Sequence, residues 1–254
     1  MARIDLYAIY SLWLREMIRF FRLKSRVVGS LAPPFFFLAI LGMGFRSTMV
    51  VPEGVNYIDF LAPGIIGMTL LFSATFGGLS MLWDREFGFL REIMVAPVSR
   101  LSIVLGRTAG GVTTAVMQGV IILVPGILMG LKITGPGGFL LSLVFMVLIA
   151  TTFNSLGLAF ASRMKDMSGF SLIMNFMVFP VFLLSGALFP VENLPPWLRI
   201  LSYLDPLTYG VDGLRASLVG VSAFPLVLDL AVLAACCAGS LALGAYLFEI
   251  SDVE

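Results

Sequence analysis

The sequence contains no histidine, only two cysteines and few charged residues: 12% of its 254 positions are Asp, Glu, Lys or Arg. Without histidine, the chain offers no imidazole for general base catalysis and no His-ligated metal site. Cys236 and Cys237 are adjacent in an apolar run, so we interpret them as packing residues and predict no metal site. The formal net charge of +1 provides no basic field for nucleic acid, and we predict no nucleic-acid partner.

Apolar residues are abundant, at 59% of the chain, and the mean hydropathy is +1.02. A soluble domain has roughly 45–50% apolar and about 25% charged residues. The remaining polar side chains are too few to cover a water-soluble globule. The composition therefore predicts an integral membrane protein and excludes a disordered chain or a disulfide scaffold.

Six charge-poor runs are each long enough to cross a bilayer, which takes about 20 residues of helix. They cover residues 27–45, 60–83, 108–131, 139–162, 167–188 and 226–248. Asp229 is the only charge inside an expected span, and it lies near the start, where interfacial water reduces its cost. We therefore predict an all-α integral membrane fold with six transmembrane helices, forming one domain over residues 1–254.

The basic residues predict the orientation of these spans. Six precede the first span, four lie between the second and third, and two between the fourth and fifth, which places twelve of the sixteen on one side. By the positive-inside rule this side faces the cytoplasm. We expect a multi-pass protein of the cell membrane with both termini in the cytoplasm.

The segment before the first span reads as an amphipathic helix. Arg15, Arg19, Arg22 and Arg26 recur at steps of four, three and four, and aromatic residues occupy much of the remaining surface. This pattern over residues 1–26 predicts a helix lying in the membrane interface. It is compatible with a lipid anchor alone or with a platform for a cytoplasmic partner.

The connection over residues 84–107 is longer than a simple loop requires. Phe87, Leu90 and Met94 recur at helical steps, Pro97 ends that pattern, and Ser99 is placed to cap the next helix. An apolar stripe of this kind can lie on lipid or insert into a groove on a partner. The stripe by itself does not decide between the two.

Residues 190–220 form a third unusual segment, on the outer side. Two helical patterns, each too short to span a bilayer, are separated at Asp205-Pro206. We interpret them as a re-entrant helical hairpin, which requires burial in protein or a cavity at membrane depth, and therefore as a candidate gate.

Polar and small residues inside the spans predict helix packing rather than chemistry. We expect Gln118, Asn154 and Asn175 to form hydrogen bonds between helices. The spacings Gly106-xxx-Gly110 and Gly126-xxx-Gly130 permit close approach of helices. The chain has no G-x-x-x-x-G-K-[ST] phosphate loop, so we expect a partner to supply the energy for any transport.

Two stretches resemble a known family. DREFGFLREIMVAPVSRLSIVLGR (84–107) resembles the loop after the second span of type-2 ABC transporter permeases, and LLSGALFPVENLPPWLRILSYLDPLTYGVDGLR (183–215) resembles that family's segment between the fifth and sixth spans. The drug-resistance branch of daunorubicin-type exporter permeases is the most similar. The resemblance implies a homodimer in the membrane with two separate ATPase subunits that bind Mg-ATP. It also implies that the chain is not itself an enzyme and holds no cofactor.

The resemblance also implies roles for particular residues. In the family the loop after the second span docks on the ATPase, and the next cytoplasmic turn makes a smaller contact. By this resemblance the residues that couple the chain to the ATPase are Asp84, Arg85, Glu86, Phe87, Leu90, Arg91, Glu92, Pro97, Arg100, Arg163, Lys165 and Asp166. Candidates for the translocation path, for which lipid contact or core packing is the alternative, are Phe35, Phe36, Phe72, Met174, Met177 and Phe179. Candidates for the external gate are Pro195, Trp197, Leu201, Asp205, Pro206 and Tyr209.

These expectations combine into one functional hypothesis. The chain would be the permease subunit of an ATP-driven exporter that moves a lipophilic or amphipathic substrate, such as a drug or lipid, by alternating access. An exporter of a glycan or a lipid-linked oligosaccharide is the alternative within the same class. An ion-coupled secondary transporter or channel is the alternative from another class, and it would act without an ATPase. A membrane-embedded enzyme would need inward polar clusters that the spans lack.

Overall fold

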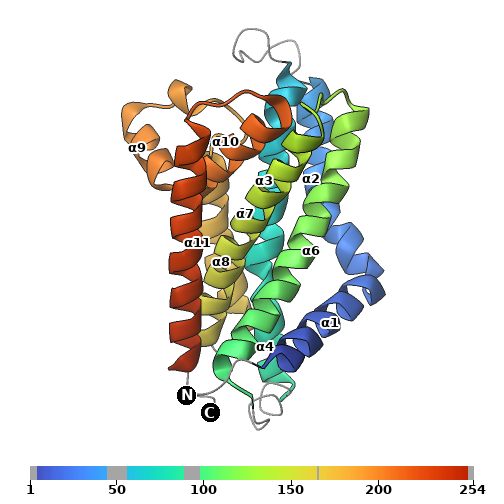
Figure 1. The fold of residues 1–254 in the computed structure, drawn as a ribbon, viewed down its shortest axis with the longest axis vertical. Helices are drawn as coiled ribbons and strands as arrows, with labels where there is room; N and C mark the ends of the chain where they lie inside the picture. Colours follow the sequence, from blue (N-terminus) through green and yellow to red (C-terminus); the bar gives the residue numbers. More distant parts are fainter. Residues whose placement is uncertain (1–4, 45–55, 89–97, 165, 251–254) are drawn as a thin grey trace.

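The computed structural model describes residues 5–44, 56–88, 98–164 and 166–250, and every regular element within these ranges is a helix. Six helical segments are long and apolar enough to cross a membrane, as the sequence predicted. They run side by side along the long axis of the molecule (Figure 1). The start of α1 and the end of α11 lie at the same end of this bundle (Figure 1).

The spanning segments are α2 (Lys24–Gly44), α3 (Tyr57–Gly77) continued by α4 (Leu79–Glu86), α6 (Arg100–Leu128), α7 (Pro136–Arg163), α8 (Met167–Leu184) and α11 (Leu226–Glu249). The shorter elements are α1 (Leu6–Arg22), the 3₁₀ turn η1 (Val191–Asn193), α9 (Pro196–Leu204) and α10 (Pro206–Val219). In Figure 1, α1 crosses the lower end of α6, whereas α9 and α10 lie at the upper end.

Helix α3 forms the centre of the bundle. Every residue from 57 to 71 is buried, and the helix packs against α2, α6, α7 and α10. A helix that is apolar on all sides needs neighbours on all sides, which explains why α3 is central and the less buried α2 and α8 are peripheral.

The second predicted span, 60–83, is broken where α3 meets α4 at Gly78. A Cβ atom on Gly78 would lie 2.4 Å from the carbonyl oxygen of Gly157, and one on Gly157 would lie 2.3 Å from that of Thr75. Asn154 also donates a hydrogen bond to Ala74 O at 3.0 Å. The backbones of α3 and α7 therefore touch directly, which only glycine permits.

Two other predicted span limits shift by four residues or more. The third span was expected to begin at residue 108, but α6 begins at Arg100, because Ser99 accepts from Ser102 N at 3.1 Å and caps the helix. Arg107 then lies inside the helix instead of ending it, since it has a buried ionic partner. The fifth span ends at Leu184, not at residue 188, because the chain turns at Gly186, where φ is +71°.

The polar residues of the spans follow the prediction in part. Gln118 of α6 accepts from Ser30 of α2 at 3.2 Å, and Asn154 joins α7 to α3. For Asn175 the prediction was wrong: its exposed side chain donates to Ser171 O within α8. Asp229 was expected near interfacial water, yet it is fully buried, because α10 covers this side of α11, and neither carboxylate oxygen has a hydrogen-bond partner.

Helix α1 packs against α6. A Cβ atom on Gly106 would lie 3.1 Å from Ile9 O, and one on Gly110 would lie 2.8 Å from the Cβ atom of Glu16. The Trp13 indole donates to the Thr113 hydroxyl at 3.1 Å. The spacing Gly106-xxx-Gly110 thus allows α1 to pack closely on α6. In the spacing Gly126-xxx-Gly130, by contrast, Gly130 lies in a turn with φ of +110°.

Candidate functional site at the two ends of the bundle

A buried ionic cluster holds the α1 end of the bundle. Arg107 Nη2 of α6 donates to Asp84 Oδ2 of α4 at 2.7 Å, and Arg15 of α1 pairs with the other oxygen of the same carboxylate. Asp84 is 4% exposed and Arg107 is 5% exposed. Asp84 was predicted as an ATPase contact, but its carboxylate points inward and fixes three helices to one another.

The end of α4 lies beside the turn between α7 and α8. Arg85 Nη1 donates to Met164 O at 3.4 Å. In this turn Arg163 and Asp166 are exposed, and Asp166 caps α8 by accepting from Gly169 N. The two segments predicted to contact an ATPase are therefore adjacent, although about 80 residues separate them in the sequence.

The tip after α4 is open to solvent. Glu86 is exposed, and Phe87 is 82% exposed at the helix end. Arg100 is exposed at the start of α6. The other predicted coupling residues lie outside the described residues: Leu90, Arg91, Glu92, Pro97 and Lys165.

Two of the six path candidates come together. Phe72 of α3 and Phe179 of α8 pack edge to face, with ring centroids 5.5 Å apart, and both line a cavity of about 430 Å³. Phe35 and Phe36 lie on the exposed face of α2, away from that cavity, and Met177 is half-buried. Met174 is fully buried in a core cluster within the bundle and lines no part of the cavity.

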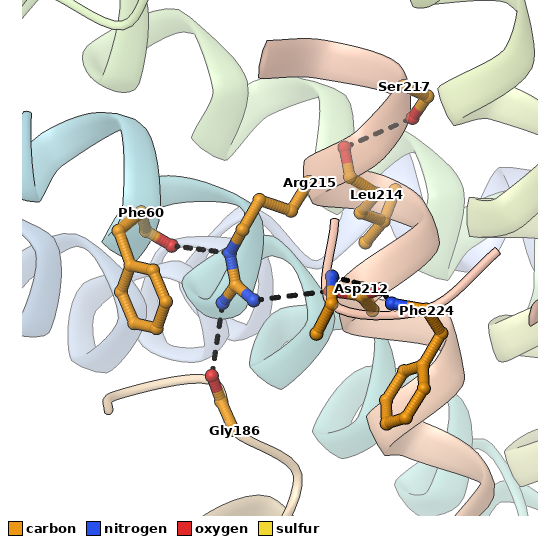
Figure 2. A network of polar contacts seen from close by, with 8 residues as sticks. Phe60, Gly186, Asp212, Leu214, Arg215, Ser217 and Phe224 are labelled. Carbon is orange, nitrogen blue, oxygen red and sulfur yellow. Dashed lines mark hydrogen bonds and ion pairs between the residues drawn. The ribbon is translucent and has the colours of Figure 1, made fainter. Parts of the chain in front are cut away.

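An arginine network holds the opposite end together (Figure 2). The Arg215 guanidinium of α10 stacks 3.8 Å from the centroid of the Phe60 ring of α3, and its Nη2 donates to Gly186 O at 3.0 Å. Its Nη1 lies 3.6 Å from Asp212 Oδ1. The Asp212 carboxylate in turn accepts from the backbone N–H groups of Ala223 and Phe224, and so holds the loop that leads to α11.

Helices α9 and α10 meet at Asp205, as predicted. Asp205 Oδ1 accepts from Leu207 N at 2.9 Å and caps α10. Burial of the carboxyl raises the pKa of Asp205 to about 7. The hydrogen bond from Leu207 N lowers this pKa, but by less than burial raises it. Thr208 donates to Ser202 O, and Tyr209 donates to Tyr203 O, so the two helices are hydrogen-bonded to each other at their junction.

The predicted gate residues differ in exposure. Asp205 is buried, and Pro206 and Tyr209 are half-buried at the junction of α9 and α10. The exposed ones, all on or before α9, are Pro195, Trp197 and Leu201. The exposed residues form an apolar outer surface, whereas the junction is fixed to the bundle.

The sequence analysis did not predict the structural roles of Arg107 and Arg215. It counted both only among the basic residues that predict the orientation of the spans in the membrane. The pair Asp212 and Arg215, three apart on one helix, was a usable signal for a buried ion pair. The pair Asp84 and Arg107 had no such signal, since it joins different helices. Among the described residues, no group of three or more potential metal ligands gathers.

The sequence is similar to those of known transport proteins. The sequence profile of the ABC-2 type transporter family matches residues 7–219, which include all but the first residue of α1 and every element from α2 to α10. The inner membrane transport permease YadH of Escherichia coli K12 is 29% identical over 89% of this chain and 88% of its own length. The putative transport permease ycf38 of Pyropia yezoensis is 30% identical over 82% of this chain and 72% of its own. Nodulation protein J of Rhizobium leguminosarum bv. viciae is 27% identical over 77% and 76%.

The family match thus covers most of the chain, including the α4 tip, the α7–α8 turn and the two helices fixed by Arg215. A bundle of six helices that are long and apolar enough to cross a membrane agrees with a multi-pass membrane component of a transport system. The chain belongs to the ABC-2 type transporter family, as a membrane permease subunit.

Proposed function

We propose that this chain is the membrane subunit of an ATP-driven exporter and that two copies work with two separate ATPase subunits. The observation that carries the proposal is the exposed tip of α4 beside the α7–α8 turn. The Phe87 ring is 82% exposed at the end of an ion-paired helix, so it is available for burial by a partner. Permeases of this family generally pair with ATPase subunits.

The ionic cluster supports a mechanism of alternating access. Because Asp84 binds both Arg15 and Arg107, a push on the tip would move α4, α1 and α6 together. Breaking such a buried pair costs about 3–5 kcal/mol, so the cluster would transmit motion rather than yield. The spans would then re-pack between two arrangements that open to opposite sides of the membrane.

The apolar faces of α2 and α8 support both the homodimer and an amphipathic substrate. Phe35 and Phe36 on α2 and Phe176 on α8 are exposed in the protomer. Paired faces of this kind in two copies would enclose a path lined by phenylalanine and methionine, which adapts to varied lipophilic molecules such as drugs or lipids. At the other end, the exposed α9 surface would shape the exit.

Two substitutions at the tip test the proposal. The chain is co-expressed with the ABC ATPase encoded nearest to it in its genome, and retention of the ATPase is measured after purification through the chain. Phe87→Asp should weaken retention at least about tenfold, since burying a phenylalanine is worth about 1.5–3 kcal/mol. Glu86→Arg should reduce substrate-stimulated ATP hydrolysis in proteoliposomes without changing the protein level.

The matched control is Trp197→Asp, which changes another exposed aromatic residue, at the opposite end of the bundle. It should leave ATPase retention unchanged. Wild-type retention in both tip variants, or equal loss in the Trp197 variant, would contradict the coupling role. Transport that persists in vesicles without any ATPase would support the ion-coupled alternative.

A further inference from the structure

A cavity of about 430 Å³ lies within one protomer, between α1, α2, α3, α6 and α8. Ligand sites in proteins commonly occupy about 300–1,000 Å³. Most of the wall is apolar, and its largest members are Phe20, Phe37, Phe72, Phe76 and Phe179. Two of the path candidates, Phe72 and Phe179, belong to this wall, and Arg107 of the ionic cluster lies at one end of it.

One end of the cavity carries unsatisfied positive groups. Arg107 lines it and binds Asp84 through Nη2 alone, while its buried Nε and Nη1 have no hydrogen-bond partner. Arg19 also lines it, and its buried Nη1 has no hydrogen-bond partner either. Buried polar groups are nearly always hydrogen-bonded, and guanidinium groups bind oxyanions with two donors at once.

The ion pairs at this end leave those nitrogens without hydrogen bonds. Arg107 shares the Asp84 carboxylate with Arg15, and Glu16 Oε1 lies 3.8 Å from Arg19 Nη1, beyond hydrogen-bond distance. Among the described residues, Arg107 Nε and Nη1 and Arg19 Nη1 are therefore donors available to an oxyanion beside an apolar wall.

We infer that this cavity binds an anionic membrane lipid, with its phosphate held by Arg19 and Arg107 and one acyl chain along the phenylalanine wall. A soluble anion would not use the apolar wall, and a neutral lipid would leave the guanidinium donors unpaired. The site lies at the α1 end, which the positive-inside rule assigns to the cytoplasmic leaflet, where anionic lipids gather. The inference goes beyond the proposed function and does not depend on which molecule is exported.

The test measures lipid binding by the intact permease–ATPase complex in proteoliposomes. The probe is spin-labelled phosphatidylglycerol, and spin-labelled phosphatidylcholine is the reference. The wild type should prefer phosphatidylglycerol. Arg19→Gln should lower this preference about tenfold, the effect of losing one charge-assisted hydrogen bond. Ser73→Phe, which fills the cavity from α3, should reduce the immobilised fraction of both probes.

Arg22→Gln is the matched control, because it removes the same charge from an exposed position of α1 outside the cavity. It should leave the preference unchanged. An equal loss in the Arg22 and Arg19 variants would mean general surface attraction and overturn the site, as would a wild type with no preference. The lipid inferred here stays bound throughout the transport cycle. Release of the immobilised probe during ATP turnover would therefore overturn the inference, since the bound lipid would then be transported cargo.

Discussion

At the scale of single residues, two buried arginines hold opposite ends of the bundle. Arg107 joins α6 to α4 through Asp84, and Arg215 joins α10 to α3 and to the turn at Gly186 (Figure 2). Arg215 uses its planar guanidinium for several contacts at once, which an ammonium group cannot do. Its role therefore depends on shape as well as charge.

Arg215→Lys tests this dependence. Lysine keeps the positive charge beside Asp212 but loses the stacking on Phe60 and the forked hydrogen bonds. We expect a loss of about 2 kcal/mol of stability, measured as a lower thermal midpoint in detergent. Arg163→Lys, at an exposed position, is the control and should change nothing. An unchanged midpoint for the Arg215 variant would mean that charge alone fixes α10.

Asp205 predicts a pH dependence. Its pKa is raised to about 7 in the folded chain, against 3.8 as the ordinary value, because the carboxyl is buried. The folded state therefore keeps this proton where the unfolded state has lost it, so stability falls as pH rises from about 4 to about 7 and is constant above that.

Asp205→Asn should remove this contribution, since an amide oxygen can still cap α10 without ionising. The thermal midpoint of the variant minus that of the wild type should increase between pH 5 and pH 8. The pKa shift of Asp205, from 3.8 to about 7, corresponds to a change in the free energy of unfolding of about 4 kcal/mol at most. The same difference at both pH values would show that Asp205 is not protonated in the folded chain.

At the scale of helices, the sequence predicted which segments cross the membrane but not how they meet. Charge-poor runs defined the six spans, and the Asp205-Pro206 break separated α9 from α10 as expected. Two departures from the predicted spans depended on contacts between distant segments. Arg107 is tolerated inside α6 only because Asp84 pairs with it, and Gly78 is a break because Gly157 approaches it.

The same reason explains the differences at the candidate site. Asn154 and Asn175 are alike in sequence context, but only Asn154 faces a neighbouring helix. Asp84 was predicted to be a surface contact, but Arg15 of α1 and Arg107 of α6 enclose its carboxylate. The cavity beside Arg107 depends on how α1 packs across α6, and the helical periodicity of the sequence does not predict that packing.

Gly157→Val tests the contact between α3 and α7. The new side chain would meet the carbonyl of Thr75, since even a Cβ atom would lie 2.3 Å from that oxygen. Overpacking of this kind costs about 1–3 kcal/mol, so the thermal midpoint in detergent should fall. Gly239→Val is the control, because nothing lies within 4 Å of its Cβ position. Equal midpoints in the two variants would mean that the helices separate without cost.

At the scale of the whole molecule, the charges divide between two ends. Arg15 and Arg85 lie at the α1 end, where they contact α4 and the α7–α8 turn, and Lys132 and Arg215 lie at the other, near the start of α3. This separation agrees with the division of basic residues in the sequence. It predicts that the α1 end faces the cytoplasm.

Cysteine labelling tests the orientation in a background with Cys236→Ala and Cys237→Ala. Asp166→Cys, at the α7–α8 turn, should react with an impermeant maleimide only after the cells are opened. Asn193→Cys, before α9, should react in intact cells. Both positions are exposed, so access to the reagent is the only difference. The reverse pattern would invert the topology.

Position-specific photo-cross-linking shows whether the end formed by α4 and the α7–α8 turn binds the ATPase. A photoreactive phenylalanine analogue is placed at position 87 or at position 197 of the permease co-reconstituted with its ATPase. We expect a permease–ATPase cross-link from position 87 and none from position 197. A cross-link from position 197, or only lipid adducts from position 87, would contradict it.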